Sequence, residues 1–296
     1  MQITLSKYAG FCDGVQRAYA MVEKIAQDPK VKKPIFVLGC LVHNVEVVAK
    51  IESLGVKKIN IEGELADFFE KIKGQVGTLV IAAHGIGPGI YELAKRYDVD
   101  LVDTTCPRVI KVQRLAKNFF EKNVQIVIIG EKEHKEVVGI FQWGGENAVF
   151  VGTKADLQAL NLNPNREIAV LSQTTQDQKF VQFAGQEILR KYPTARVFDS
   201  ICLATHNRQT EVIKLATEHE VVIIIGDPTS SNSKRLWEAA KRINKNSYFI
   251  QKTEELDEKW FENKKTVAVG AGASTPKWII KEVVAKLNRI KTISLS

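Results

Sequence analysis

Four cysteines are the most chemically distinctive residues of this 296-residue sequence: Cys12, Cys40, Cys106 and Cys202. Cys106 follows Cys12 by 94 residues, and Cys202 follows Cys106 by 96, yet no two cysteines form a Cys-x-x-Cys pair. The sequence therefore lacks the cysteine pairs that usually indicate a zinc ribbon or a thioredoxin-like motif. Three widely spaced thiolates can hold a zinc ion with an open fourth position, or an iron–sulfur cluster that leaves one iron without a protein ligand. The spacing alone favours neither metal over the other.

A second set of polar side chains follows short apolar runs along the whole chain. Three of these runs, PIFVLG, VQIVIIG and VVIIIG, end at Gly39, Gly130 and Gly226. Three more are TLVIAAHG, EIAVLSQTT and TVAVGAGAST. The polar residues within or after these runs are His43, His84, His134, Glu136, Thr174, Ser230, Ser231, Asn232 and Ser274. Ligands bind beyond the carboxyl ends of the strands in open α/β sheets, so these positions predict a binding site.

Two of these segments have the character of phosphate-binding loops. Residues 230–232 (Ser-Ser-Asn) stand between an apolar run and the helical pattern KRLWEAAKRI, and Ser274 stands just before Pro276, which suits the start of a helix. Hydroxyl groups and free backbone N–H groups at a helix N-terminus attract anions. Helix capping alone would use the same residue types, so the pattern leaves both interpretations open.

The elements that must position these side chains form a threefold repeat. Each of Cys12, Cys106 and Cys202 is followed by a helical apolar pattern and then by buried-type strands, which predicts an α/β fold of three similar units with mainly parallel sheets. We place the units at residues 13–105 (with an N-terminal strand in 1–12), 106–201 and 202–285, with a tail at 286–296. A pseudo-threefold arrangement would bring the three thiolates to one centre, each at a helix N-terminus that lowers its pKa. Cys40 has no counterpart in the other units, so we interpret it as structural.

Composition limits the classes of function. The apolar fraction is 45% and the charged fraction 26%, which is typical of a globular protein, and no apolar run approaches the roughly 20 residues of a membrane span. The N-terminus lacks a secretory signal pattern, so we expect a cytoplasmic protein. The net charge is +8, but basic residues are interleaved with acidic ones, which argues against nucleic-acid binding.

Taken together, the motifs resemble one family. The series GFCDGVQRA, LVHN, AHG, DTTCP, EHKEVVG, SQTT, DSIC, NRQ, SSNSKRL and GAGASTP is similar to that of the LytB/IspH family of 4-hydroxy-3-methylbut-2-enyl diphosphate reductases, from about residue 9 to residue 276. Each motif alone is weak, whereas the combined series is specific. The resemblance implies a three-lobed α/β architecture around a central cluster, in agreement with the repeat.

The resemblance also implies a reaction and a set of roles. A 4Fe–4S cluster would be held by Cys12, Cys106 and Cys202, and an allylic hydroxyl would be removed reductively with two electrons and two protons, giving isopentenyl and dimethylallyl diphosphate. Glu136 would be the proton source, relayed through Thr174. The diphosphate-binding residues would be His43, His84, His134, Ser230, Ser231, Asn232 and Ser274. An acidic donor such as a ferredoxin or flavodoxin would match the net positive charge.

The sequence departs from the family pattern at two positions. Lys135 stands where the family commonly has proline, next to Glu136, and Cys40 stands where the family usually has another residue. Two further hypotheses remain: a zinc-dependent hydrolase of a phosphorylated small molecule, built on the same cysteines, and a basic nucleic-acid-binding protein with a redox-sensing cluster. The first would contain one zinc and no iron, and the second would need a continuous basic stripe.

Overall fold

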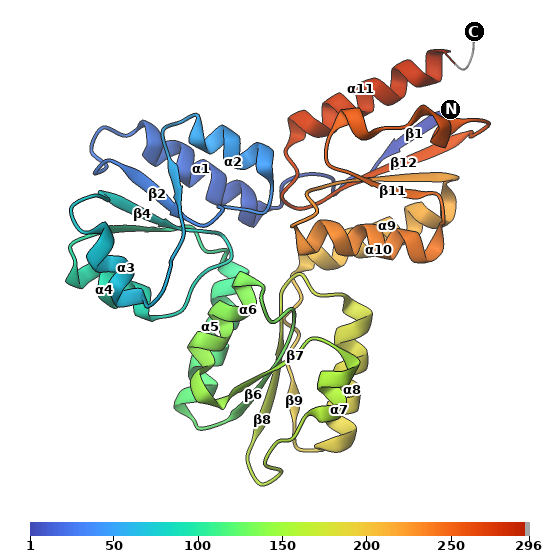
Figure 1. Ribbon diagram of the computed structural model, residues 1–296. Coiled ribbons are helices and arrows are strands. Elements are labelled where there is room, and N and C mark those ends of the chain that lie inside the picture. Colours follow the sequence, from blue (N-terminus) through green and yellow to red (C-terminus); the bar gives the residue numbers. More distant parts are fainter. Residues whose placement is uncertain (294–296) are drawn as a thin grey trace. The chain divides into compact units, whose positions relative to one another are not determined.

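Short apolar runs form the central strands of three sheets in a computed structural model, which describes residues 1–293 (Figure 1). Each sheet has four strands, and every strand pair is parallel. The innermost strands, such as β6 (Gln125–Ile129) and β10 (Val221–Ile225), are buried along their whole length. Continuous apolar strands of this kind are expected where helices cover both faces of a parallel sheet. The prediction of three parallel α/β units is confirmed.

The sheet formed by strands within residues 35–103 has the order β3-β2-β4-β5. Its strands are β2 (Ile35–Leu38), β3 (Lys57–Ile59), β4 (Thr78–Ile81) and β5 (Asp100–Asp103). The helices of this stretch are α1 (Asp13–Gln27), α2 (Val45–Glu52), α3 (Leu65–Ile72) and α4 (Gly89–Arg96). Phe69 of α3 and Ile90 of α4 pack against Leu79 and Ile81, so these two helices cover one face of the sheet.

The middle sheet has the order β7-β6-β8-β9. Besides β6, its strands are β7 (Ala148–Val151), β8 (Ile168–Ser172) and β9 (Arg196–Val197). The helices of this stretch are α5 (Pro107–Glu121), α6 (Lys135–Gly144), the short 3-10 turn η1 (Gly145–Asn147), α7 (Lys154–Ala159) and α8 (Gln178–Lys191). Helices α5 and α6 pack against Ile126 and Ile128, and α7 and α8 pack against Val127 and Ile129, because alternate strand residues face opposite sides.

The last sheet has the order β1-β12-β10-β11. Its other strands are β1 (Gln2–Leu5), β11 (Ser247–Ile250) and β12 (Thr266–Ala271). The remaining elements are α9 (Leu203–Glu218), α10 (Ser231–Ile243), α11 (Lys277–Ile293) and the 3-10 turns η2 (Thr253–Glu255) and η3 (Glu258–Phe261). Ile223 faces the core beneath α11, and Ile224 faces the core beneath α9 and α10.

Two boundaries differ from those predicted from the sequence. The N-terminal strand, assigned to the first α/β unit, pairs instead with β12 of the last sheet, with Gln2 opposite Thr266. It is the edge strand that precedes Cys12, just as β5 precedes Cys106 and β9 precedes Cys202, so the repeat is closed by the beginning of the chain. The predicted tail 286–296 is wrong as far as Ile293, because α11 continues to that residue. Residues 294–296 lie outside the described part.

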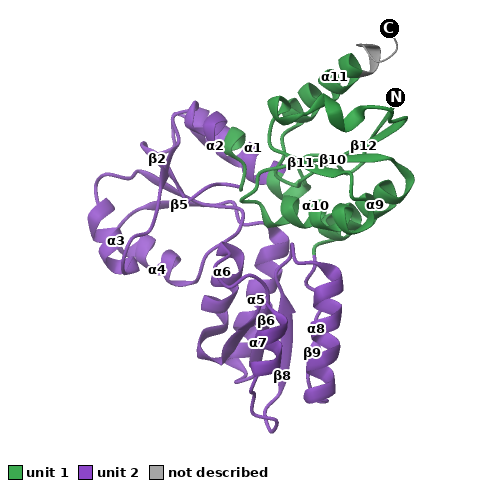
Figure 2. Ribbon diagram, turned by 45° about the vertical axis from the view of Figure 1, so that its right-hand side comes forward, with its two compact units in different colours: residues 1–15, 43–47, 202–296 green, residues 16–42, 48–201 purple. Residues whose placement is uncertain are grey.

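The chain divides into two compact units, which Figure 2 shows in green and purple. The first compact unit comprises residues 1–15, 43–47 and 202–296 and contains the last sheet, and the second comprises residues 16–42 and 48–201 and contains the other two. A short excursion at residues 43–47 thus belongs with the C-terminal part of the chain. None of the helices within residues 1–293 has the length and apolar character that crossing a membrane requires.

Candidate active site

Each of the three repeat-related cysteines stands at the N-terminus of a helix. Cys12 directly precedes α1, and its Sγ accepts a hydrogen bond from the Val15 backbone N–H at 3.5 Å. Cys106 and Cys202 are the N-cap residues of α5 and α9, with Pro107 in the first turn of α5. All three are partly exposed. The predicted strand-to-helix junctions are therefore confirmed.

The two cysteines of the first compact unit share a buried cation. Burial lowers the pKa of the Arg208 guanidinium from its ordinary value, while the nearby Cys12 and Cys202 thiols oppose that shift. Arg208 remains charged, since arginine is not deprotonated in proteins. Soft sulfur donors at helix N-termini, close to a fixed positive charge, fit an anionic iron–sulfur centre.

Cys106 belongs to the second compact unit. Over residues 1–293, no three His, Cys, Asp or Glu side chains are gathered into a metal-binding group. Ligation of one cluster by all three cysteines therefore stays a prediction.

Glu136 and Thr174 form a buried acid pair in the second compact unit. Glu136 lies in the first turn of α6 and is only 2% exposed. Its Oε1 accepts the Thr174 backbone N–H at 2.6 Å, and its Oε2 accepts the Thr174 hydroxyl at 2.9 Å. Burial raises the pKa of Glu136 to about 7, although the two hydrogen bonds from Thr174 act in the opposite direction. A carboxyl group that gains and loses its proton near neutral pH is suited to proton transfer.

His84 and His134 also come together in the second compact unit. Their rings meet edge to face, with centroids 5.6 Å apart and an interplanar angle of 81°. His134 is the N-cap of α6, and its Nδ1 accepts the backbone N–H of Glu136 at 3.2 Å. In the neutral ring the proton therefore lies on Nε2, which can donate to an anion. The same helix N-terminus thus positions one predicted phosphate donor and the predicted acid.

The predicted phosphate loop caps α10 in the first compact unit. Ser230 is the N-cap of α10, and its Oγ accepts from the Ser233 N–H and hydroxyl at 3.4 and 3.1 Å. Ser231, Asn232 and Ser274 are buried beside it. The Ser274 hydroxyl donates to the His43 carbonyl at 2.9 Å and lies 3.5 Å from the Ser230 Oγ, so these contacts join three of the predicted binding segments in one unit.

Asn232 departs from the usual behaviour of buried polar groups. Its side chain is 6% exposed, and neither Oδ1 nor Nδ2 has a hydrogen-bond partner among the described residues. Buried amides are nearly always paired, because leaving one unpaired costs about 1–3 kcal/mol. An amide held in this condition at the N-terminus of a 13-residue helix is well placed to bind a ligand.

The sequence matches the LytB protein family over residues 3–288. The chain belongs to the LytB family. Relatives in it are named 4-hydroxy-3-methylbut-2-enyl diphosphate reductase. The protein of that name from Symbiobacterium thermophilum is 35% identical over 95% of this chain and 94% of its own length, and that from Geotalea daltonii is 37% identical over 98% of each.

Solved structures of LytB-type reductases are similar to this chain. The Plasmodium falciparum E-1-hydroxy-2-methyl-but-2-enyl-4-diphosphate reductase superimposes with a TM-score of 0.88 at 31% identity, covering 96% of this chain and 87% of that one. A second similar structure is that of (E)-4-hydroxy-3-methyl-but-2-enyl diphosphate reductase, the terminal enzyme of the non-mevalonate pathway. It superimposes with a TM-score of 0.69 at 32% identity, covering 98% of this chain and 100% of that one. The resemblance inferred from the motifs is confirmed.

The two departures from the LytB pattern lie side by side. Lys135 packs its ammonium group over Gly39, the residue before Cys40, and a Cβ built on Gly39 would lie 1.9 Å from the Lys135 Nζ. Gly39 also has a φ of +70°, a conformation that favours glycine. The Lys135 ammonium thus extends toward the end of β2, while the oxygens of Glu136 accept from Thr174. The added cation leaves the acid pair intact.

Three residues that position parts of the candidate site were not assigned a role from the sequence. Asp227 is buried directly after β10, and its Oδ2 accepts the Val45 N–H at 3.0 Å, which anchors the segment that carries His43. Arg17 donates to the carbonyls of Thr104 and Thr105 just before Cys106, at 3.5 and 3.2 Å. Arg208 is the third. Asp227 follows a Gly-terminated strand, and the two arginines lie within the motifs GFCDGVQRA and NRQ, so each position carried a signal that could have identified it.

Proposed function

We propose that this LytB-family protein is the reductase that converts 4-hydroxy-3-methylbut-2-enyl diphosphate into isopentenyl and dimethylallyl diphosphate. The reaction adds two electrons and two protons and releases the hydroxyl as water. The observation that carries the proposal is the Glu136–Thr174 pair, a buried acid with a pKa of about 7, in a chain whose relatives bear that name. Such an acid can protonate a leaving hydroxyl, which would otherwise depart as an unstable hydroxide.

The cofactor in this proposal is a 4Fe–4S cluster with Cys12, Cys106 and Cys202 as its ligands. When bound, the cluster would supply electrons and an iron that binds the substrate oxygen. Three partly exposed cysteines at helix N-termini support this assignment, because thiolates are the usual ligands of iron–sulfur clusters. The protein's own part is to orient the thiolates and to keep Arg208 next to two of them.

Diphosphate binding is proposed for two groups of polar side chains, one in each compact unit. In the first, Ser230, Ser231, Asn232 and Ser274 surround the N-terminus of α10, and His43 lies beside Ser274. In the second, His84 and His134 would donate from their rings. The buried amide of Asn232 and the dipole of α10 support this role, because anions prefer helix N-termini.

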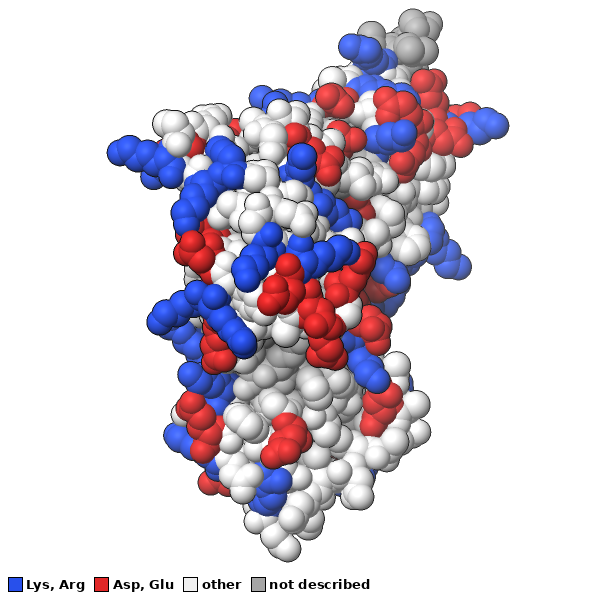
Figure 3. Space-filling model, turned by 60° about the vertical axis from the view of Figure 1, so that its left-hand side comes forward, with Lys and Arg blue, Asp and Glu red and all other residues white. Residues whose placement is uncertain are grey.

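The electron donor would be an acidic protein such as a ferredoxin or flavodoxin. Lys111, Arg114 and Lys117 are exposed along α5, the helix that Cys106 caps, and they line two hollows of about 430 and 350 Å³. On the face shown in Figure 3, basic side chains are otherwise interspersed with acidic ones, unlike a continuous nucleic-acid stripe. Rising salt should slow reduction by such a donor, because screening weakens charge steering. A rate that is insensitive to salt would contradict this assignment.

The proposal is tested by purifying the protein under anaerobic conditions and measuring iron, sulfide and substrate turnover. We expect a brown protein with about four irons that converts the allylic diphosphate when a reductant is supplied. Cys106→Ser and Cys202→Ser should lose the cluster, whereas Cys40→Ser, at the position interpreted as structural, should keep it. A metal-free protein would overturn the proposal, and one zinc without iron would favour the hydrolase.

A further inference from the structure

Arg208 holds an unusual position in the first compact unit. It lies on α9, six residues after Cys202, and is 6% exposed. Its Nη1 donates to the Ala204 carbonyl at 3.0 Å, and its Nη2 donates to the Gly10 carbonyl at 2.7 Å. One guanidinium therefore joins the first turn after Cys202 to the segment just before Cys12. Its position is fixed by these two backbone contacts, so the charge cannot move away into solvent.

The hydrogen-bonding capacity of Arg208 is not exhausted by these contacts. Its Nε is buried and has no hydrogen-bond partner among residues 1–293. Burying a cation is costly unless it is paired, and burial lowers the pKa of this arginine. The groups that oppose that shift are, in order, Cys12, Cys202, Asp13 and Glu211. Glu211 also accepts the Ser6 hydroxyl and, at 3.1 Å, the Lys7 backbone N–H, so its charge is shared with other donors.

We propose that Arg208 is a positioning residue that sets the reduction potential of the cluster through a fixed positive charge beside Cys12 and Cys202. This inference rests on the proposed function, because it requires a cluster on those cysteines. When the oxidised cluster accepts one electron from the external donor, its negative charge increases by one and no bond is made or broken. A nearby cation stabilises the more negative state, so it makes the cluster easier to reduce.

Two variants separate the charge of Arg208 from its hydrogen bonds. Arg208→Gln removes the charge but retains an N–H donor, and Arg208→Lys retains the charge but loses the planar fork. Lys214→Gln is the matched control, because Lys214 is on the same helix, is largely exposed and pairs only at 3.8 Å with Glu218. Salt screens an exposed charge, so its removal should leave the cluster unaffected.

The experiment is an anaerobic redox titration of the reconstituted full-length proteins with dithionite, monitored by electron paramagnetic resonance, with iron measured in parallel. At a fixed potential, the ratio of reduced to oxidised cluster should fall about tenfold in Arg208→Gln, which corresponds to about 59 mV for one electron. Arg208→Lys should stay within about threefold of the unmodified protein, and Lys214→Gln should match it.

The possible outcomes distinguish this inference from the function on which it rests. An unmodified protein without a cluster overturns the proposed function. A full cluster in Arg208→Gln with an unchanged ratio overturns the role of the charge, and so does an equal fall in the Gln and Lys variants, which would indicate only the contact with Gly10. If Arg208→Gln binds no cluster, Arg208→Lys decides: a near-normal ratio supports the charge, and loss of the cluster refutes it.

Discussion

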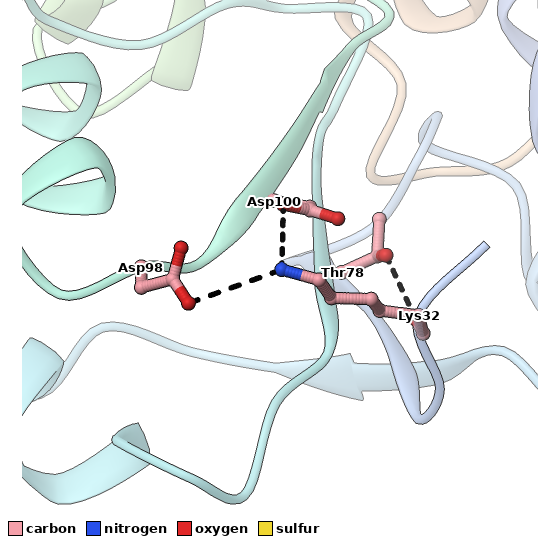
Figure 4. Close-up of polar contacts among 4 residues, drawn as sticks. All are labelled: Lys32, Thr78, Asp98 and Asp100. Carbon is pink, nitrogen blue, oxygen red and sulfur yellow. Dashed lines mark hydrogen bonds and ion pairs between the residues drawn. The ribbon is translucent and has the colours of Figure 1, made fainter.

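Polar groups at the amino-terminal ends of the parallel strands differ in exposure and in pairing from those at the carboxyl ends. At the amino-terminal end of β4 and β5, Lys32 pairs with Asp100 at 3.3 Å and with Asp98 at 3.9 Å, and the Thr78 hydroxyl donates to the Lys32 carbonyl at 2.8 Å (Figure 4). The charged side chains there are at least half exposed. Every side chain drawn in Figure 4 has a partner from the protein.

At the carboxyl ends of the strands, by contrast, polar groups are buried at a cost to stability. Glu136 has an unfavourable environment for its charged form, and Asn232 has an amide without a protein partner. Burial of such groups costs free energy that packing elsewhere in the units must offset. The amino-terminal ends thus serve the fold, whereas the carboxyl ends retain unfavourable groups, as the proposed ligand and reaction would require.

The sharpest test of this contrast is Glu136→Gln, which keeps the shape of the side chain and removes its acidity. We expect kcat to fall by about a hundred- to ten-thousand-fold, the usual contribution of a positioned acid, with a normal iron content. Glu133→Gln is the matched control, because it makes the same change at an exposed side chain three residues earlier, and it should keep full activity. Turnover with a chemical reductant measures both. Near-normal activity in Glu136→Gln would remove Glu136 from the mechanism.

Two asparagines of equal burial offer the next test. Asn232 and Asn44 are both 6% exposed, but the Asn44 Oδ1 accepts the N–H groups of Glu46 and Val47 at 3.1 and 3.2 Å. Asn232→Leu should weaken diphosphate binding about ten- to a hundredfold and raise the stability of the substrate-free protein by about 1 kcal/mol. Asn44→Leu should lower the free energy of unfolding by about 1 kcal/mol, because it removes a helix cap.

Calorimetric binding and thermal unfolding of the two variants provide the measurements. Equal destabilisation by both leucine substitutions would mean that Asn232 is an ordinary structural amide.

The pH dependence should follow the raised pKa of Glu136. The proton donor exists below about pH 7, so the rate of the chemical step should fall about tenfold for each pH unit above it. The same shift affects folding: the group's contribution to stability is complete below pH 4.5, where the unfolded chain is also protonated, and is lost as pH rises through 7. Rate profiles from pH 6 to 9 test this. A profile as steep in Glu136→Gln as in the unmodified protein would assign the titration to another group.

The sequence predicted the elements and the family, because both depend on local patterns. The sequence directly shows the continuous apolar runs, Pro107 after Cys106 and the spacing of the cysteines. It misplaced β1, since the pairing of residues 2–5 with β12 joins segments some 260 residues apart, and no local signal specifies that partner. The error shows that the repeat closes through the chain's beginning.

The polar side chains of the candidate site could be predicted from the sequence, but the contacts that position them could not. Glu136 and Thr174 were both identified, yet their direct contact across 38 residues emerged only from the fold. Arg208 and Asp227 act on backbone atoms, and any segment presents the same carbonyls and N–H groups. Arg208 lies in the NRQ motif, but the motif does not reveal which backbone atoms the side chain contacts, because the contact depends on the conformation of another segment.

The smallest expected effect is at the opposite end of the strands. Lys32→Met removes both ion pairs of Figure 4, and because these charges are exposed we expect a loss of at most about 1 kcal/mol in the free energy of unfolding. The loss should shrink further at high salt, and turnover should be unchanged. Denaturant unfolding at low and high salt, together with an activity assay, measures it. A salt-insensitive loss of several kcal/mol would show that the amino-terminal end also stores unfavourable groups, and the difference between the two ends would then be one of degree.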